Sequence, residues 1–139
     1  MSRNGADLAL LLLAGFRHMA EEATVRLTAR GHPGVRPAHD FALRAIAGGA
    51  GTVSEVGRRT SVSKQAAAKT VAFLEEAGYV RRTPDGRDRR RSQLTVTDRG
   101  VSLMSEGEAV FDELRAEWES LIGRDRVAEV QTALERLLE

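Results

Sequence analysis

The sequence contains no cysteine among its 139 residues. This excludes disulfide bonds, thiolate zinc sites and redox sensing by thiols. Proline and aromatic residues are also scarce, with three prolines and an aromatic fraction of 4%. The one strongly apolar run, LALLLLA at residues 8–14, is far shorter than the ~20 residues that a membrane-spanning helix needs.

The same run also lacks the surroundings of a secretory signal peptide. Asp7 precedes it where a basic segment would be expected, and Phe16, Arg17 and His18 follow it in place of a small-residue cleavage site. We therefore interpret the run as part of a buried helix, and we expect a cytoplasmic protein.

The charge is unevenly distributed along the chain, although the net charge is only +1. Residues 58–99 contain eleven basic and five acidic residues, whereas the rest of the chain contains ten basic and fifteen acidic residues. Apolar residues make up 42% and charged residues 29%, as in an ordinary globular domain. A basic segment within an acidic chain indicates a surface that meets an anionic partner.

Residues 7–29 have apolar side chains at helical spacing, in steps of three and four. These side chains are Leu8, Leu12, Phe16, Met19, Ala23 and Leu27. Because Leu10, Leu11 and Leu13 fall on other faces, the first half of this predicted helix is apolar nearly all round. Such a helix must be covered on more than one side, and a second subunit could provide the cover.

The middle of the sequence predicts a helix-turn-helix. Residues 31–37 predict a loop, Pro37 begins a helix through about Ala47, and GGAG at 48–51 ends it. Residues 52–55 match a capping box in front of a short helix to about residue 59. After a tight turn at 60–63, Ser63 is a suitable N-cap for a helix over 64–77, which Gly78 ends.

A hairpin follows this unit, with predicted strands at 79–84 and 92–97 in which Leu94 and Val96 share one face. Two further helices are predicted, one capped by Thr97 and running to about Ile122, the other after Gly123. Their apolar stripes are Phe111, Leu114, Trp118 and Leu121, then Val127, Val130, Leu134 and Leu137. The fold class is therefore mainly α with a small β-wing: a winged helix-turn-helix flanked by N- and C-terminal helices.

Two stretches carry a family resemblance, DRRRSQLTVTDRG at 88–100 and SVSKQAAAKTVAFLEEAGYVRR at 61–82. The first fits the pattern D-R-R-x-x-x-L-x-x-T-x-x-G. Through them the sequence resembles the MarR family of bacterial winged-helix transcription regulators over nearly the whole chain. The resemblance implies one MarR-like chain over 1–139, with a DNA-binding region at 37–100 and dimerisation helices at 7–30 and 101–139.

The resemblance also implies an obligate homodimer that pairs through its first and last helices. Such a dimer would bind double-stranded DNA at a pseudo-palindromic operator, more often as a repressor than as an activator. Many members release DNA when an aromatic or phenolic acid binds between the dimer helices and the winged region.

The helix at 64–77 is the predicted recognition helix, which would enter the major groove with its N-terminal turns. Gln65 can pair with an adenine edge, while Lys64 and Lys69 could reach a guanine or a phosphate. The predicted contact residues are Ser61, Ser63, Lys64, Gln65, Ala66, Ala68 and Lys69. The alternative is that these are only the solvated side chains of a surface helix.

The arginine-rich segment is the predicted wing tip. Arg90 resembles the family's wing-tip arginine and Asp88 the carboxylate that orients it, which would place a guanidinium in a narrow minor groove. Arg87, Arg89 and Arg91 would serve phosphates. The alternative is a loop whose charges only keep it solvated. Four further arginines could either touch phosphates or pair with Glu75 and Glu76; they are Arg58, Arg59, Arg81 and Arg82.

By family position, the first, second and fifth helices would line an effector pocket. The candidate residues are Phe16, His18, His39, Phe41, Arg44, Leu114 and Trp118. Most of them could equally be packing residues of the core or of the dimer interface.

Catalysis is not indicated. The three histidines are 14 and 7 residues apart, which is not a metal-ligand spacing, and we expect neither a metal nor another cofactor. Three alternatives stay open: a winged-helix protein-interaction module without DNA binding, a DNA-binding protein that responds to no ligand, and, as the weakest, a metal-assisted hydrolase.

Overall fold

The computed structural model describes residues 3–84 and 92–139. The first four helices are α1 (Gly5–Ala29), α2 (Pro37–Ala47), α3 (Val53–Thr60) and α4 (Lys64–Glu76). The strands β1 (Val80–Pro84) and β2 (Ser92–Val96) follow, and then α5 (Asp98–Ile122) and α6 (Arg124–Leu137). The prediction of a mainly helical fold with a two-stranded wing is confirmed.

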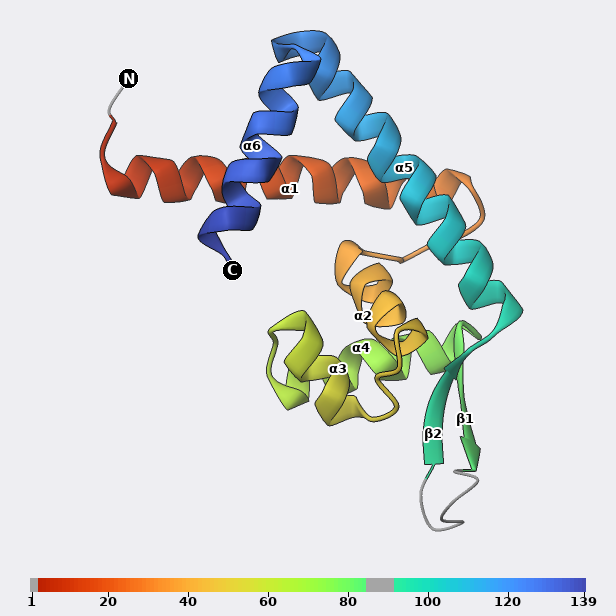
Figure 1. Cartoon of the computed structure of the whole chain (residues 1–139). Helices are drawn as coiled ribbons and strands as arrows, with labels where there is room; N and C mark the ends of the chain where they lie inside the picture. Colours follow the sequence, from red (N-terminus) through yellow and green to blue (C-terminus); the bar gives the residue numbers. More distant parts are fainter. Residues whose placement is uncertain (1–2, 85–91) are drawn as a thin grey trace.

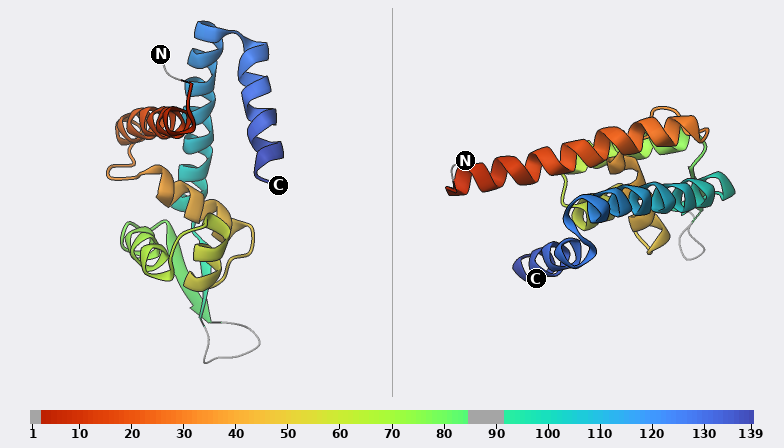
Figure 2. Two further views of the ribbon diagram at one scale, coloured as in Figure 1. Left: turned by 90° about the vertical axis from the view of Figure 1, so that its left-hand side faces the viewer. Right: turned by 90° about the horizontal axis from the view of Figure 1, so that it is seen from above.

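The elements form two groups that share α5. Helices α2, α3 and α4 gather beside the wing, and α5 leads from β2 away from this group and past α1 (Figure 1). Helix α6 then folds back alongside α5, and the N-terminal half of α1 extends away from α2–α4 (Figure 2). None of the helices within residues 3–84 and 92–139 has the length and apolar character needed to cross a membrane.

Side-chain caps begin the helices of the winged region where the sequence predicts them. Ser63 Oγ accepts a hydrogen bond from the backbone N–H of Ala66 at 3.1 Å, and Thr97 Oγ1 accepts one from Gly100 at 3.1 Å. The capping box predicted at 52–55 forms only in part. Thr52 caps the N–H of Glu55, but the Glu55 carboxylate accepts from the N–H of Gly51, at 3.2 Å, and not from Thr52.

The end of α4 has the predicted left-handed glycine. Gly78 has φ +83°, and its N–H donates to the carbonyl of Glu75 at 3.1 Å. The next N–H, that of Tyr79, donates to the carbonyl of Leu74 at 2.8 Å, which completes a Schellman motif. The chain therefore turns sharply out of α4 and into the wing.

The wing is an antiparallel pair in which Val80 lies opposite Val96 and Pro84 lies opposite Ser92. Leu94 of β2 is buried, as the alternation in its strand predicts. The core lies between the second half of α1, the helices α2 to α4, the wing and the first half of α5. Its largest fully buried side chains are Tyr79, Leu27, Leu43, Leu74, Leu103 and Leu114.

The predicted apolar stripes of the outer helices are only partly buried. In α1, Ala23 and Leu27 are buried, but Leu8 is 61% exposed. In α5, Leu121 is 81% exposed, and the buried face is instead Gly100, Leu103, Gly107, Val110 and Leu114. In α6 only Val127 is buried. Met19 and Phe111 of the predicted stripes are partly buried against the core. The most exposed members lie toward the outer ends of the helices.

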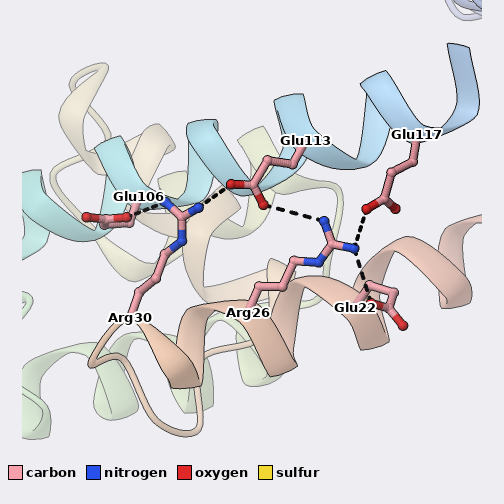
Figure 3. A network of polar contacts seen from close by, with 6 residues as sticks. All are labelled: Glu22, Arg26, Arg30, Glu106, Glu113 and Glu117. Carbon is pink, nitrogen blue, oxygen red and sulfur yellow. Dashed lines mark hydrogen bonds and ion pairs between the residues drawn. The ribbon is translucent and has the colours of Figure 1, made fainter. Parts of the chain in front are cut away.

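An ion-pair network fixes α1 against α5 (Figure 3). Arg26 contacts Glu117 at 2.7 Å and Glu113 at 3.4 Å, and Arg30 contacts Glu106 at 2.6 Å and also Glu113. The hydrogen bond that Arg26 donates to Glu117 raises the pKa of Arg26, and the one that Arg30 donates to Glu106 raises the pKa of Arg30. These contacts hold the second half of α1 on α5, so the direction of its first half is set as well.

Candidate nucleic-acid interface

The turn between α3 and α4 is built for a close approach of the two helices. Ser61 adopts a left-handed conformation, with φ +58°, and ends α3. At Gly57 a Cβ atom would lie 3.1 Å from the carbonyl oxygen of Val62, so a larger residue would push the turn away from α3. This packing turns α4 so that one face meets the core and the other meets solvent.

The turn between α3 and α4 and the first two turns of α4 carry every residue that the sequence predicts for major-groove contact. Ala67, Val71 and Leu74 are buried, as their helical spacing requires. All seven predicted contact residues are exposed: Ser61, Ser63, Lys64, Gln65, Ala66, Ala68 and Lys69. Ser63 is already engaged as the N-cap, where its oxygen accepts a hydrogen bond and its hydroxyl proton stays free to donate. The first two turns of α4 therefore present two ammonium groups and one amide to solvent.

The four arginines near this surface differ in whether they have partners within the chain. Arg82 donates from Nε to Glu75 at 3.0 Å, and Arg59 donates to the carbonyl of Gly48 at 2.8 Å. Both guanidinium groups are thus partly occupied within the chain. Arg58 and Arg81 are exposed, and no ion pair within residues 3–84 and 92–139 involves them.

The predicted wing-tip residues lie outside the described residues. They are Arg87, Asp88, Arg89, Arg90 and Arg91, in the segment that joins the two strands of the wing. The described part of the wing ends at the paired residues Pro84 and Ser92. The side chains that the wing offers to DNA therefore stay a prediction from the sequence.

The predicted effector-pocket residues are divided among several places. Phe16 and Phe41 line one cavity of about 350 Å³, whose wall also includes Ala66 and Thr70 of α4. The sequence analysis does not identify these two α4 residues as lining a cavity, because an alanine and a threonine on a surface helix carry no such signal. The cavity lies between α1, α2, α3 and the first two turns of the predicted recognition helix.

The other candidates lie elsewhere. Arg44 and Phe41 border an open cavity of about 490 Å³ together with Arg59. Trp118 lines a cavity of about 670 Å³ between α1, α5 and α6. Leu114 is a fully buried core residue, and His18 is exposed on α1.

His39 has a structural role that the sequence analysis misses. Its Nδ1 accepts a hydrogen bond from the backbone N–H of Arg36 at 2.8 Å, which caps α2, and its ring stacks on Phe73 of α4 at 4.0 Å. Burial, followed by the positive charge of Arg36, lowers the pKa of His39. The neutral ring suits this role because a protonated Nδ1 could not accept.

The described residues contain no group of three or more histidine, aspartate or glutamate side chains that could hold a metal ion. The first two turns of α4 offer positive charge and hydrogen-bond donors to solvent. The chain has the architecture of a winged helix-turn-helix, a class in which the second helix of the pair is inserted into the major groove of DNA.

Comparisons with known proteins agree with this class. The family model described as "MarR family" matches residues 34–91. The Mycobacterium tuberculosis MarR family protein Rv2887, solved in complex with p-aminosalicylic acid, is 27% identical with a TM-score of 0.72, and the match covers 95% of this chain and 98% of that chain. No curated protein sequence matches the chain.

Two more distant structures show the same fold. A mutant MarR from E. coli is 18% identical with a TM-score of 0.75, and the match covers 100% of this chain and 99% of that chain. A mutant MepR from S. aureus, bound to an oligodeoxyribonucleotide, is 16% identical with a TM-score of 0.59, with 94% and 95% covered.

Residues 34–91 match the MarR family model, and the whole chain has the fold of the MarR-family winged-helix regulators to which it is similar. The matched family and the matched structures are those of DNA-binding regulators.

Proposed function

We propose that this protein is a homodimeric repressor that binds a pseudo-palindromic operator in double-stranded DNA. The observation that carries the proposal is the surface formed by the turn after α3 and the first two turns of α4, where all seven residues expected to contact DNA are exposed. In this assignment residues 37–100 form the DNA-binding region, and residues 7–30 and 101–139 form the dimer. Each subunit places residues 63–69 in one major groove and the wing in the flanking minor groove.

The uncovered apolar surface supports the dimer. The first half of α1 exposes a series of large apolar side chains: Leu8, Leu10, Leu11, Leu12, Leu13 and Phe16. A monomer rarely leaves a patch of this kind in contact with water. The apolar cavity between α1, α5 and α6 and the exposed Leu137 and Leu138 lie in the same part of the fold. A second copy of the chain has the apolar helix that would cover both surfaces.

DNA binding is tested by selecting bound fragments from a random duplex pool and by a gel shift with the upstream region of the gene. We expect an enriched inverted repeat whose half-sites are about one helical turn apart. Arg90→Ala should weaken binding at low salt without changing the dimer. An enriched pool without symmetry would contradict the operator proposal, and failure of the wild-type protein to bind duplex DNA would favour the protein-interaction module.

The dimer is tested separately by sedimentation equilibrium. Leu12→Glu, which places a charge in the exposed apolar half of α1, should give monomers, whereas Arg17→Glu, on the same helix but outside the apolar set, should leave the dimer intact. A wild-type chain that sediments as a monomer would contradict the proposal directly.

Release of DNA by a small aromatic acid belongs to the same proposal. The relative bound to p-aminosalicylic acid and the cavity behind α4 support it. Phe41 borders this cavity and also the open one beside Arg44, so an aromatic ring near Phe41 could bring its carboxylate to a guanidinium. With p-aminosalicylic acid as the probe, titration calorimetry should show binding that Phe41→Ala removes. If the protein still binds its operator when p-aminosalicylic acid is bound, this class of ligand does not control it.

A further inference from the structure

The junction between α4 and β1 packs directly on the junction between β2 and α5. Three consecutive carbonyl groups at the end of α4 accept hydrogen bonds from the second junction. Arg99 Nε donates to Ala77 O at 3.1 Å, Thr97 Oγ1 donates to Gly78 O at 2.6 Å, and the backbone N–H of Thr97 donates to Tyr79 O at 3.1 Å. The segment that follows α4 is therefore bonded to the N-cap and the first turn of α5.

Gly100 permits this contact. A Cβ atom at this position would lie 2.3 Å from the carbonyl oxygen of Tyr79 and 2.6 Å from Cγ1 of Val96. Neither the backbone oxygen nor the wing strand can give way without opening the junction. The T-x-x-G part of the 88–100 motif, Thr97 to Gly100, thus has a physical role that does not involve touching DNA.

The hydroxyl of Tyr79 connects a third segment, the loop after α1, to these two junctions. The side chain is fully buried, with Arg99 Nη2 at 3.1 Å and His32 Nδ1 at 2.8 Å from its oxygen. Arg99 also lies 4.6 Å from the centroid of the tyrosine ring. Because an arginine can only donate, the hydroxyl keeps its own proton for His32. Burial, together with the charge of Arg99, lowers the pKa of His32, which leaves Nδ1 free to accept.

We propose that Tyr79, Thr97, Arg99 and Gly100 form a rigid joint that sets the direction of α4 relative to α5. They are positioning residues, since the contacts described for them are within the chain. The joint holds the end of the recognition helix, the start of the wing and the loop after α1 on the helix that leads to the dimer interface. Its effect on DNA spacing rests on the proposed function; the joint itself does not.

Because α5 is long, a small change of angle at this joint produces a large displacement at the far end of the helix. Its 25 residues span about 37 Å, at ~1.5 Å per residue. A tilt of about 5° at one end of a helix of this length moves the other end by about 3 Å. This is close to the rise of one base pair, ~3.4 Å. A loose joint would therefore let a dimer accept operators whose half-sites differ in spacing by a base pair.

The first test needs no DNA. Since the chain has no native cysteine, Gln65→Cys and Ser120→Cys can carry nitroxide spin labels on α4 and on the far end of α5. Both positions are exposed. Labelled chains are diluted with unlabelled chains, so that distances are measured within one chain. We expect a narrow distance distribution for the otherwise native protein, and a broadened one, or one shifted by about 3 Å, for Tyr79→Phe and for Arg99→Lys.

Both variants keep the net charge, and circular dichroism shows whether each is folded. Tyr79→Phe removes one hydroxyl from an intact ring, so it provides the test if Arg99→Lys does not fold. If the folded variants gave the same distance distribution as the native protein, the proposal of a rigid joint would be overturned.

The second test uses operators with one base pair inserted or removed between the half-sites. We expect each variant to bind the preferred operator ~10-fold more weakly than the native protein. We also expect a flatter dependence on spacing and an unchanged salt slope. Equal weakening at every spacing would indicate only a loss of folded protein and would overturn the role in spacing. If the native protein bound no DNA, the proposed function would fail, and the spin-label distances would still decide whether the joint exists.

Discussion

Asp40 is fully buried on α2, and its Oδ2 receives a hydrogen bond from Arg44 Nε, one turn further along the helix, at 2.9 Å. Arg44 also donates to the carbonyl of Met104 on α5, at 3.3 Å. The other carboxylate oxygen, Oδ1, faces Gly107 and has no hydrogen-bond partner among the described residues. Arg44 thus connects the winged region to α5. It is also the group that donates a hydrogen bond to the buried carboxylate of Asp40.

Removal of Arg44 should therefore cost stability that depends on pH. Burial raises the pKa of Asp40 above its ordinary value of 3.8, and the hydrogen bond from Arg44 opposes this rise. A raised pKa in the folded state means that the fold favours the protonated form of Asp40. The stability that Asp40 contributes in this way is complete below about pH 3.8 and is lost as the pH rises through the pKa of the folded state. Arg44→Met should lower the free energy of unfolding by about 1–3 kcal/mol at pH 7 and by less at pH 4.5, as measured by urea denaturation.

The matched control is the double variant Asp40→Asn with Arg44→Met. It has no buried charge, so we expect it to recover most of the lost stability and to show little pH dependence between these two values. A double variant no more stable than Arg44→Met alone would contradict the account of a carboxylate that needs its partner.

His39 should make the winged region less stable in acid. Its pKa is lowered in the folded state, so its neutral form contributes stability that is complete above about pH 6.5 and is lost as pH falls through the folded value. Protonation removes the acceptor for the N–H of Arg36. His39→Asn, which can accept but does not titrate, should lose less stability between pH 7.5 and pH 5.0 in thermal unfolding. His39→Ala should cost about 1 kcal/mol at pH 7.5 through loss of the cap.

His32 also has a lowered pKa, so the comparison of variants and not the wild-type curve alone isolates His39. Equal pH dependence of His39→Asn and the wild-type protein would show that the cap is not the group that titrates.

The part of the fold that follows from local signals was predictable from the sequence. Pro37 and the glycines after Ala47 place α2 at its observed bounds, and Ser63 and Thr97 cap α4 and α5 as expected. These signals work because each acts on backbone groups within three or four residues. The same reasoning placed the exposed residues of α4 correctly, since the helical spacing of Ala67, Val71 and Leu74 leaves the opposite face to solvent.

The rest depends on contacts between distant segments. The buried face of α5 includes Gly100 and Gly107, which a count of apolar side chains cannot find. The apolar periodicity of α5 predicts Leu121 on the buried stripe, but this periodicity continues past the end of the chain's own core, so Leu121 is exposed. His39 is predicted as a pocket residue, but its side chain caps α2. The cap is local, but the residue that reaches back in a capping box is normally Glu or Gln, so a histidine gives no such signal. Its stacking partner, Phe73, is 34 residues away in sequence and could not be identified from local pattern.

Gly100→Ala should destabilise the protein through steric overlap. The added methyl group would lie 2.3 Å from the carbonyl oxygen of Tyr79, and relief of this contact should cost about 1–3 kcal/mol. Gly5→Ala is the matched control. Gly5 is also helical and has no heavy atom within 4 Å of the new position, so this change should be neutral or stabilising by up to about 1 kcal/mol. Chemical denaturation measures both, and equal effects would contradict the close approach at Gly100.

The network between α1 and α5 should contribute to stability in a salt-dependent way. Arg30 contacts Glu106 and Glu113 at the protein surface, where added salt screens the attraction. Arg30→Gln should lower the melting temperature at low ionic strength, and the difference from wild type should shrink near ~1 M salt. Arg17→Gln provides the comparison, because Arg17 is exposed on the same helix and forms no ion pair within the described residues. A salt-independent difference for Arg30→Gln would indicate lost packing instead.

The cations around α4 should differ in their effect on DNA affinity. Lys64 is exposed at the tip of α4, whereas Arg82 is held by Glu75 at 3.0 Å. A cation that reaches a phosphate releases counterions, so Lys64→Gln should reduce the slope of log affinity against log salt by roughly one unit. Arg82→Gln removes the same charge, but it frees Glu75 and should change the slope by much less. Fluorescence anisotropy at a series of salt concentrations measures both slopes, and equal slopes for the two variants would mean that the Arg82–Glu75 pair opens on DNA.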